Sequence, residues 1–220
     1  MYESGAGVVT EDASLVSPDG SGYGAWKAAA EQACLAEPSL ETVRLRPPIV
    51  YGPGSRQWVS WYAQRICSGR WATFGAAGEG TCNLIHVSDV AAAVSAALTS
   101  SAATGQAFNL DGPELITWNS WFTRLANAIG APPLPQRSPS VVRAQGLAAL
   151  PLKAFARLRP GPSPEWLLGV PSRGELSLFE SRVSYATAAA HAALGWTPRV
   201  QIAEGLIDTV EWLRHKGLAS

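Results

Sequence analysis

The chain has 220 residues, of which 47% are hydrophobic and 15% are charged. This balance is typical of a globular chain with a real core and excludes a disordered tail. The length allows one domain or one and a half. Seventeen basic and seventeen acidic residues cancel, so the net charge gives no reason to expect a nucleic-acid or acidic partner.

Three cysteines, Cys34, Cys67 and Cys82, are an odd number without metal-like spacing. We therefore predict neither a disulfide framework nor a metal site, which fits a reducing cytoplasm. No stretch reaches the roughly 18 continuous apolar residues of a membrane span. The N-terminus also lacks the basic segment followed by an apolar one that marks a signal peptide. These features predict a cytoplasmic protein.

The first half of the chain alternates between helical and strand patterns, separated by glycine and proline turns. The pattern predicts a loop at 1–22, a helix from Tyr23 that Pro38 ends, and a strand at Thr42–Arg46. Pro47-Pro48 and Gly52-Pro53-Gly54 then make a rigid, turning loop, which a helix at Trp58–Ser68 and a short strand at Asn83–Val87 follow.

The second half continues the alternation. Ser88 or Asp89 is predicted to cap a helix, buried on most sides, at Val90–Leu98. A strand at Gln106–Leu110 and a helix from Thr117, its cap, to Ile129 follow. The last helix is predicted at Gln201–His215, with its apolar side chains inward: Ile202, Leu206, Val210 and Leu213.

Residues 131–165 differ in character, with many prolines and several basic residues among Leu and Ala. Val141–Leu158 is basic and amphipathic, and Pro151 interrupts or kinks it. We favour a pair of surface helices that covers the substrate cleft. The alternative is a peripheral membrane helix or a partner-docking helix.

Strands that alternate with helices predict the α/β class. Only about three good strands are visible, whereas a doubly wound parallel sheet usually has five or more. The sheet is therefore expected to be incomplete.

The sharpest local signal is Tyr23-Gly24-Ala25-Trp26-Lys27. On a helix, positions i and i+4 share a face, so the Tyr23 hydroxyl and the Lys27 ammonium would project together. A nearby cation favours the phenolate, which suits a tyrosine to general acid/base work. Taken alone the spacing is common by chance and fits a surface pair.

Five motifs in order give the pair its context. They are Tyr23 to Glu31 (YGAWKAAAE), Leu45 to Gly54 (LRPPIVYGPG), Ile85 to Ala91 (IHVSDVA), Gly105 to Leu110 (GQAFNL), and Leu194 to Pro198 with Glu204 to Leu206 (LGWTP, EGL). Together they resemble the extended short-chain dehydrogenase/reductase family, the NAD-dependent epimerases and dehydratases. The resemblance implies the C-terminal part of a Rossmann-type parallel sheet with a smaller mixed substrate-binding domain. Residues 1–130 would hold the remaining Rossmann-type part with interleaved substrate-domain segments, and 131–220 the substrate-binding lid and closing helix.

The resemblance also implies roles for individual residues. Tyr23 would be the catalytic acid/base, and Lys27 would hold the nicotinamide ribose and tune Tyr23. Both would contact the cofactor, NAD or NADP, as would a loop whose backbone lies beside the nicotinamide: Pro47, Pro48, Ile49 and Val50. His86 is expected to be structural rather than catalytic, and Asp89 to cap its helix.

The family's Gly-x-x-Gly-x-x-Gly phosphate loop does not occur in these 220 residues. Met1-Tyr2-Glu3 is in register with the family's Val-Tyr-Gly segment, so its catalytic Ser would lie just upstream of residue 1. We therefore expect an N-terminally truncated member, in which most of the NAD or NADP site is absent and the isolated chain is inactive. The alternative is a truncated remnant that acts at most as a binding module.

Two departures bear on the substrate. Sugar-nucleotide members usually carry Asn at the position of Ile49 and Arg near Cys82, and both replacements remove polar contacts suited to a diphosphate. A less charged substrate, such as an uncharged ketone, alcohol or steroid-like compound, therefore fits better than a sugar nucleotide. Neither a nucleic-acid partner nor membrane binding is expected, and a homodimer stays open.

Overall fold

The computed structural model describes residues 2–3, 6–37, 39–148 and 169–219. The chain divides into two compact units that interleave along the sequence. Unit 1 comprises Met1–Val50, Asn83–Pro113 and Val183–Val200, and unit 2 comprises Tyr51–Cys82, Glu114–Arg182 and Gln201–Ser220.

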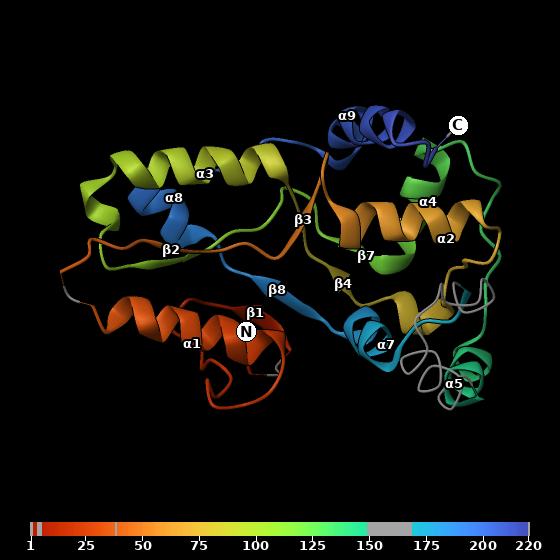
Figure 1. The fold of residues 1–220 in the computed structure, drawn as a ribbon, viewed down its shortest axis with the longest axis horizontal. Coiled ribbons are helices and arrows are strands. Elements are labelled where there is room, and N and C mark those ends of the chain that lie inside the picture. Colours follow the sequence, from red (N-terminus) through yellow and green to blue (C-terminus); the bar gives the residue numbers. More distant parts are fainter. Residues whose placement is uncertain (1, 4–5, 38, 149–168, 220) are drawn as a thin grey trace. The chain divides into compact units, whose positions relative to one another are not determined.

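Unit 1 is an α/β assembly, as the alternating pattern predicts (Figure 1). Its strands are β1 (Gly7–Val9), β2 (Arg44–Arg46), β3 (Ile49–Tyr51, whose last residue belongs to unit 2), β5 (Leu84–His86), β6 (Ala107–Asn109) and β8 (Val183–Tyr185). Its helices are α1 (Tyr23–Leu35), α3 (Val87–Thr99), the 3-10 turn η3 (Ser101–Ala103) and α8 (Ala188–Leu194). β1 pairs in parallel with β8 and β2 with β6, while β3 pairs with β5.

The side chains of β2 alternate between two environments. Leu45 packs against an apolar cluster from the strands and from α3 and α8, whose centre includes Ile85, Phe108 and Trp196. Arg44 and Arg46 instead bond to Glu31 of α1. Figure 1 shows α3 and α1 on opposite sides of β2, so this strand is covered on both faces and its period-2 alternation sorts apolar from charged contacts.

The predicted loop over residues 1–22 is wrong in one part, because Gly7–Val9 form strand β1. The segment has the composition of a turn, and Val8 is 70% exposed. Its strand conformation comes from backbone pairing with Val183–Tyr185 far along the chain, which a local pattern does not reveal.

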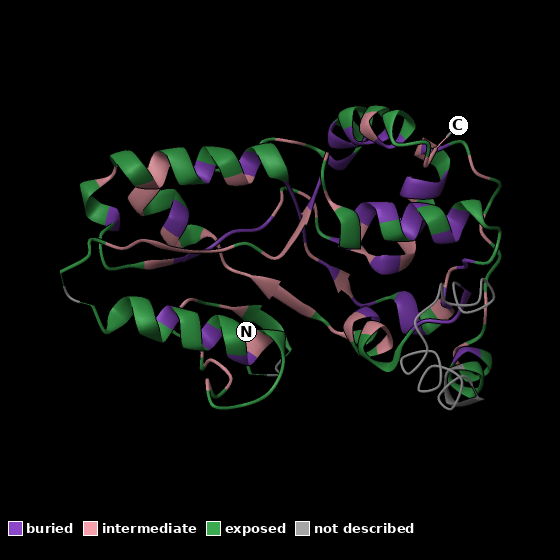
Figure 2. Ribbon diagram, in the orientation of Figure 1, coloured by how far each residue is buried: buried purple, intermediate pink, exposed green. Residues whose placement is uncertain are grey.

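The prediction for α3 needs two corrections. The helix starts at Val87, and its N-cap is His86 rather than Ser88 or Asp89. Only Asp89 and Ala93 are buried, while Leu98 is 83% exposed, so the helix is not buried on most sides (Figure 2). An alanine-rich helix has no clear polar face, so its sequence does not show which sides are buried. Here the described residues cover only one side of the helix.

In its described residues, unit 2 is helical with one short antiparallel pair, in which Thr81 faces Thr117. Its elements are the π-helical turn η1 (Arg56–Ser60), α2 (Trp61–Cys67), the 3-10 turn η2 (Gly75–Gly78), β4 (Thr81–Cys82), β7 (Ile116–Thr117), α4 (Trp118–Ala128), α5 (Pro139–Ala148), α7 (Arg173–Glu180) and α9 (Ile202–His215). Packed rings form its core: Tyr62, Trp71, Phe74, Trp118, Phe122 and Phe179.

Several predictions for unit 2 are confirmed. Thr117 caps α4 by accepting a hydrogen bond from the Ser120 N–H, and Gly130 follows with a positive φ of 73°. In α9 all of the residues predicted to face inward are buried: Ile202, Leu206, Val210 and Leu213.

The region around Pro151 lies outside the described residues, so the two interpretations of Val141–Leu158 stay open beyond the part that belongs to α5. Within the described ranges, no helix is both long and apolar enough to cross a membrane.

Candidate functional site

Tyr23 and Lys27 occupy the first turns of α1. The helix begins at Tyr23, directly after Gly22, whose φ of 101° suits glycine. Both side chains are exposed, Tyr23 by 74%. Among the described residues, the Tyr23 hydroxyl and the Lys27 ammonium have no hydrogen-bond or ion-pair partner, so both groups are available to a ligand.

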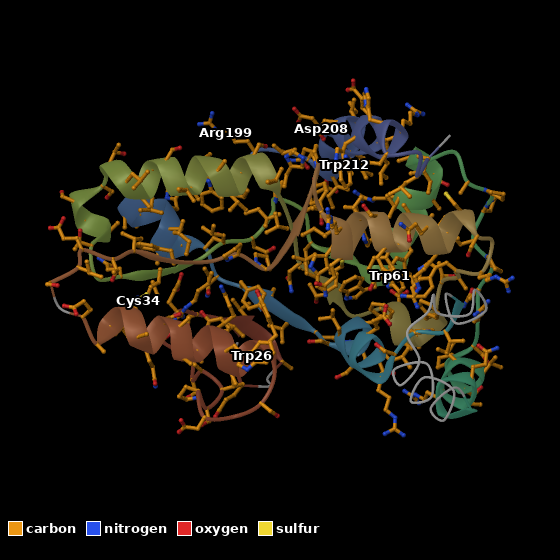
Figure 3. All side chains as sticks on the ribbon, viewed as in Figure 1. Trp26, Cys34, Trp61, Arg199, Asp208 and Trp212 are labelled. Carbon is orange, nitrogen blue, oxygen red and sulfur yellow. The ribbon has the colours of Figure 1, made fainter. Side chains whose placement is uncertain are left out.

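Other side chains of α1 face solvent as well. Trp26 is 69% exposed, and Figure 3 marks it and Cys34 on the same helix. The helix is attached to the rest of unit 1 on its opposite face, where Ala25, Ala28 and Glu31 are buried.

The predicted nicotinamide segment, Pro47 to Val50, follows β2 directly. Pro47 is exposed, whereas Pro48, Ile49 and Val50 are partly buried. The Ile49 N–H donates to the carbonyl of Asn83 at 3.1 Å, and Val50 packs against the apolar cluster of unit 1. Among the described residues, no hydrogen bond or ion pair joins this segment to Tyr23 or Lys27.

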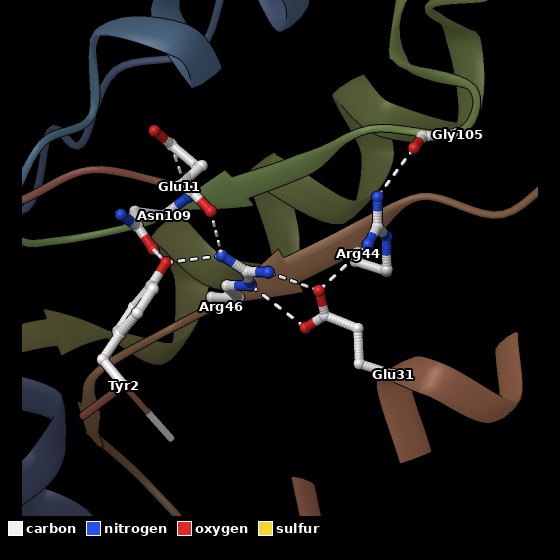
Figure 4. Close-up of polar contacts among 7 residues, drawn as sticks. All are labelled: Tyr2, Glu11, Glu31, Arg44, Arg46, Gly105 and Asn109. Atoms are coloured by element: carbon white, nitrogen blue, oxygen red, sulfur yellow. Dashed lines mark hydrogen bonds and ion pairs between the residues drawn. The ribbon is translucent and has the colours of Figure 1, made fainter. Parts of the chain in front are cut away.

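A buried ion-pair cluster joins α1 to β2 instead (Figure 4). Glu31 is only 8% exposed. One of its carboxylate oxygens accepts from Arg44 at 3.0 Å and also from Arg46, and the other accepts from Arg46 Nε at 3.1 Å. Because Arg46 immediately precedes Pro47, this cluster links the helix that carries Tyr23 and Lys27 to the predicted nicotinamide segment.

Arg46 also holds the N-terminal segment. Its Nη1 donates to the Tyr2 hydroxyl at 2.6 Å and to the Glu11 carbonyl at 2.9 Å, and Tyr2 in turn donates to the Asn109 side chain. The Asn109 N–H donates to the Glu11 carboxylate at 2.8 Å. Burial raises the pKa of Tyr2, although the Arg46 contact opposes it. Burial also opposes the charge of Arg46, but its bonds to Glu31 and Tyr2 outweigh burial and raise the pKa of Arg46.

Asp111 is another buried acid of unit 1, two residues beyond Asn109. Burial raises the pKa of its carboxyl group from 3.8 to about 6, although backbone N–H groups of Gly112 and Tyr185 donate to it. The Gly112 N–H lies 2.9 Å from Asp111 Oδ1. Burial likewise raises the pKa of Tyr185, and the charge of Asp111 adds to this effect.

The structure gives His86 and Asp89 anchoring contacts. His86 Nδ1 lies 2.7 Å from the Ser88 hydroxyl and caps α3. The carboxylate of Asp89 accepts from the N–H groups of Arg199 and Val200, both at 3.0 Å. Asp89 is therefore not the helix cap we predicted, because its two oxygens hold the segment that follows Trp196.

Unit 2 has its own buried charge, Arg65. Its guanidinium lies 3.7 Å from the ring centre of Trp71 and pairs with Glu175. Burial lowers the pKa of Arg65, and burial together with the nearby Glu175 charge raises that of Tyr62. This cluster ties α2 to α7 and reads as a structural one.

Sequence reasoning missed the contacts among Tyr2, Glu31, Arg46 and Asn109, although it noted Glu31 and Arg46 as motif members. One signal was available. Glu31 falls on the face of α1 that carries the buried Ala25 and Ala28, and a charge on a buried face requires a partner.

The fold is a Rossmann-type α/β arrangement with parallel strand pairs, and an exposed tyrosine–lysine pair begins its first helix. Comparison with known families agrees: the model of the NAD-dependent epimerase/dehydratase family matches residues 1–111. The chain belongs to this family.

Two relatives and one solved structure illustrate the similarity. The chain is 30% identical to a 2-alkyl-3-oxoalkanoate reductase of Stenotrophomonas maltophilia, over 84% of this chain and 56% of the relative. It is 27% identical to a UDP-glucose 4-epimerase of Mycolicibacterium smegmatis, over 80% of this chain and 47% of that relative. The structure of a UDP-glucuronic acid 4-epimerase from Bacillus cereus with NAD matches with a TM-score of 0.67 at 18% identity, over 98% of this chain and 58% of that one. The chain thus spans about half the length of these curated relatives.

Proposed function

We propose that the chain supplies the acid/base helix and the nicotinamide-side segment of an NAD(P)-dependent oxidoreductase, epimerase or dehydratase. The reaction is hydride transfer at a carbinol or ketone carbon. The observation that carries the proposal is the pair Tyr23 and Lys27 on one exposed face of α1. Neither side chain has a hydrogen-bond or ion-pair partner among the described residues. Glu31 anchors the same helix through its ion pair with Arg44.

The exposed groups fit the ribose and nicotinamide end of the cofactor. The bound cofactor would donate or accept the hydride. Tyr23 exchanges a proton with the substrate oxygen at its hydroxyl, and Lys27 binds the ribose hydroxyls and favours the phenolate of Tyr23. The main chain of Pro47 to Val50 orients the nicotinamide, and the apolar contacts of Val50 keep that segment in place.

These 220 residues contain no glycine-rich phosphate loop to bind the pyrophosphate of the dinucleotide. The chain alone is therefore expected to hold a dinucleotide by its nicotinamide end only. This favours, as a second candidate, a chain that binds a small ligand or a partner without turnover.

For the substrate we propose an alcohol or ketone without a diphosphate. Ile49 is partly buried in β3 and Cys82 is fully buried, so neither position offers the charge or hydrogen bonds that hold a sugar nucleotide. The relative named as a 2-alkyl-3-oxoalkanoate reductase, which by its name acts on a ketone, supports this choice.

A chimera tests the proposal. The aligned part of this chain, 84% of its length, would replace the matching region of the Stenotrophomonas reductase, which supplies the part that the chain does not span. We expect oxidation of NADH or NADPH with alkyl ketones. Tyr23→Phe should lower it by about 10²–10⁴-fold while cofactor binding persists. Trp26→Phe, which changes an exposed aromatic side chain on the same helix, serves as the control. Full activity of the Tyr23→Phe chimera would contradict the proposal.

A further inference from the structure

Lys27 and Glu31 are four residues apart on α1. Side chains at this spacing are neighbours on a helix surface, about 5–6 Å apart at Cβ, and a lysine four residues before a glutamate attracts it, although more weakly than in the reverse order. An unconstrained α1 would therefore tend to pair the carboxylate of Glu31 with the ammonium of Lys27.

The structure shows a different pairing. The Glu31 carboxylate faces β2 and bonds to Arg44 and Arg46, and its side chain is only 7% exposed. Within the described part of the chain, no carboxylate lies within 4.0 Å of the Lys27 ammonium. Two guanidinium groups pair with this one carboxylate, so their positive charges offset its negative charge at Lys27.

Arg46 is itself held in place. Its Nη1 donates to the Tyr2 hydroxyl and to the Glu11 carbonyl, while Nε and Nη2 reach Glu31 (Figure 4). The guanidinium therefore cannot follow Glu31 if that side chain turns toward Lys27, and the rotation would break bonds at a buried charge.

We propose that Arg46, together with Arg44, is a positioning residue that holds Glu31 away from Lys27 and keeps the Lys27 ammonium uncompensated beside Tyr23. This rests on the proposed function. A free ammonium can bind a ribose hydroxyl and favour the phenolate of Tyr23, whereas a Lys27–Glu31 pair would cancel much of that field and occupy a donor.

Lysine side-chain NMR tests the pairing directly. The chain has only three lysines, Lys27, Lys153 and Lys216, so their 15N-labelled ammonium signals are few. A freely hydrated ammonium exchanges its protons quickly and gives no signal, whereas an ion-paired one is detected. In the parent, the Lys27 signal should be absent. In the Arg44→Gln/Arg46→Gln double variant it should appear, and adding Glu31→Gln should remove it again. A double variant without the Lys27 signal would overturn the proposal.

A milder variant guards against loss of the fold. Arg44 is 17% exposed in its side chain, so Arg44→Gln alone should fold and give a weaker Lys27 signal. Arg124→Gln, which removes an ion pair with Glu114 at 2.6 Å in unit 2, should leave the lysine spectrum unchanged. An equal effect from Arg124→Gln would also overturn the proposal, because a general loss of stability would then explain the change.

Binding of reduced nicotinamide mononucleotide separates this inference from the proposed function. The arginine double variant should bind it about 3–10 times more weakly than the parent, as expected for one weakened charged contact. Glu31→Gln in the same background should restore the affinity. A parent that does not bind the mononucleotide would contradict the proposed function, while the lysine spectra would still decide whether Arg44 and Arg46 control Glu31.

Discussion

Asp111→Asn should stabilise the protein at neutral pH. The carboxyl group is 9% exposed, and its pKa is raised from 3.8 to about 6 because burial disfavours its charge. A folded-state pKa above the unfolded value means that ionisation opposes folding. Below pH 3.8 the carboxyl group is neutral in both the folded and the unfolded state, and it costs the protein no stability. This stability is lost as the pH rises through about 6, because the buried group then ionises.

The two pKa values set the magnitude. Their difference corresponds to about 3 kcal/mol of lost stability above the folded-state pKa. Asn retains only one oxygen to accept from the Gly112 N–H, now 2.9 Å away, and from the Tyr185 N–H, and its amide nitrogen needs an acceptor. We therefore expect a gain of about 1–3 kcal/mol near pH 7.5 and less than about 1 kcal/mol near pH 4.

Urea unfolding at the two pH values measures this difference. Asp19→Asn makes the same substitution at an exposed position of unit 1 and should change stability by less than about 0.5 kcal/mol at either pH. If Asp111→Asn destabilised the protein near pH 7.5, or had the same effect at both pH values, the burial argument would be refuted.

Three further changes follow from the same contacts. Tyr23→Phe in the active chimera should lower turnover by about 10²–10⁴-fold with little change in cofactor affinity, measured by steady-state kinetics and fluorescence titration. Gly112→Ala should destabilise unit 1 by at least about 3 kcal/mol in urea unfolding, because its Cβ would lie 1.9 Å from the Leu84 carbonyl oxygen. Thr117→Ala should cost about 1 kcal/mol, since it removes the cap of α4, and Thr117→Ser should restore most of it.

Local signals predicted the elements whose causes lie within a few residues. The Thr117 cap, the glycine after α4 and the apolar stripe of α9 need no knowledge of distant contacts, and the structure has all three. The start of α1 at Tyr23 is of the same kind, since Gly22 provides a backbone conformation outside the helix.

Contacts between distant segments were beyond a local pattern. β1 exists because it pairs with a strand more than 170 residues later, and Asp89 is held by N–H groups of Arg199 and Val200. The exposure of Leu98 depends on which neighbours α3 has, and its own composition carries no sign of that. For the candidate site, motifs indicated Tyr23 and Lys27, while the pairing of Glu31 with Arg44 and Arg46 could be seen only in three dimensions.

The central claim is that this chain carries the nicotinamide side of a dinucleotide site. Saturation-transfer NMR on the 220-residue protein can test it with reduced nicotinamide mononucleotide and NADH in parallel. We predict transfer to the nicotinamide protons of both ligands, with similar weak affinities because no adenylate contacts add to either, and loss of transfer in Lys27→Ala. Absence of transfer from the parent, equal transfer from Lys27→Ala, or far tighter binding of NADH than of the mononucleotide would contradict the account.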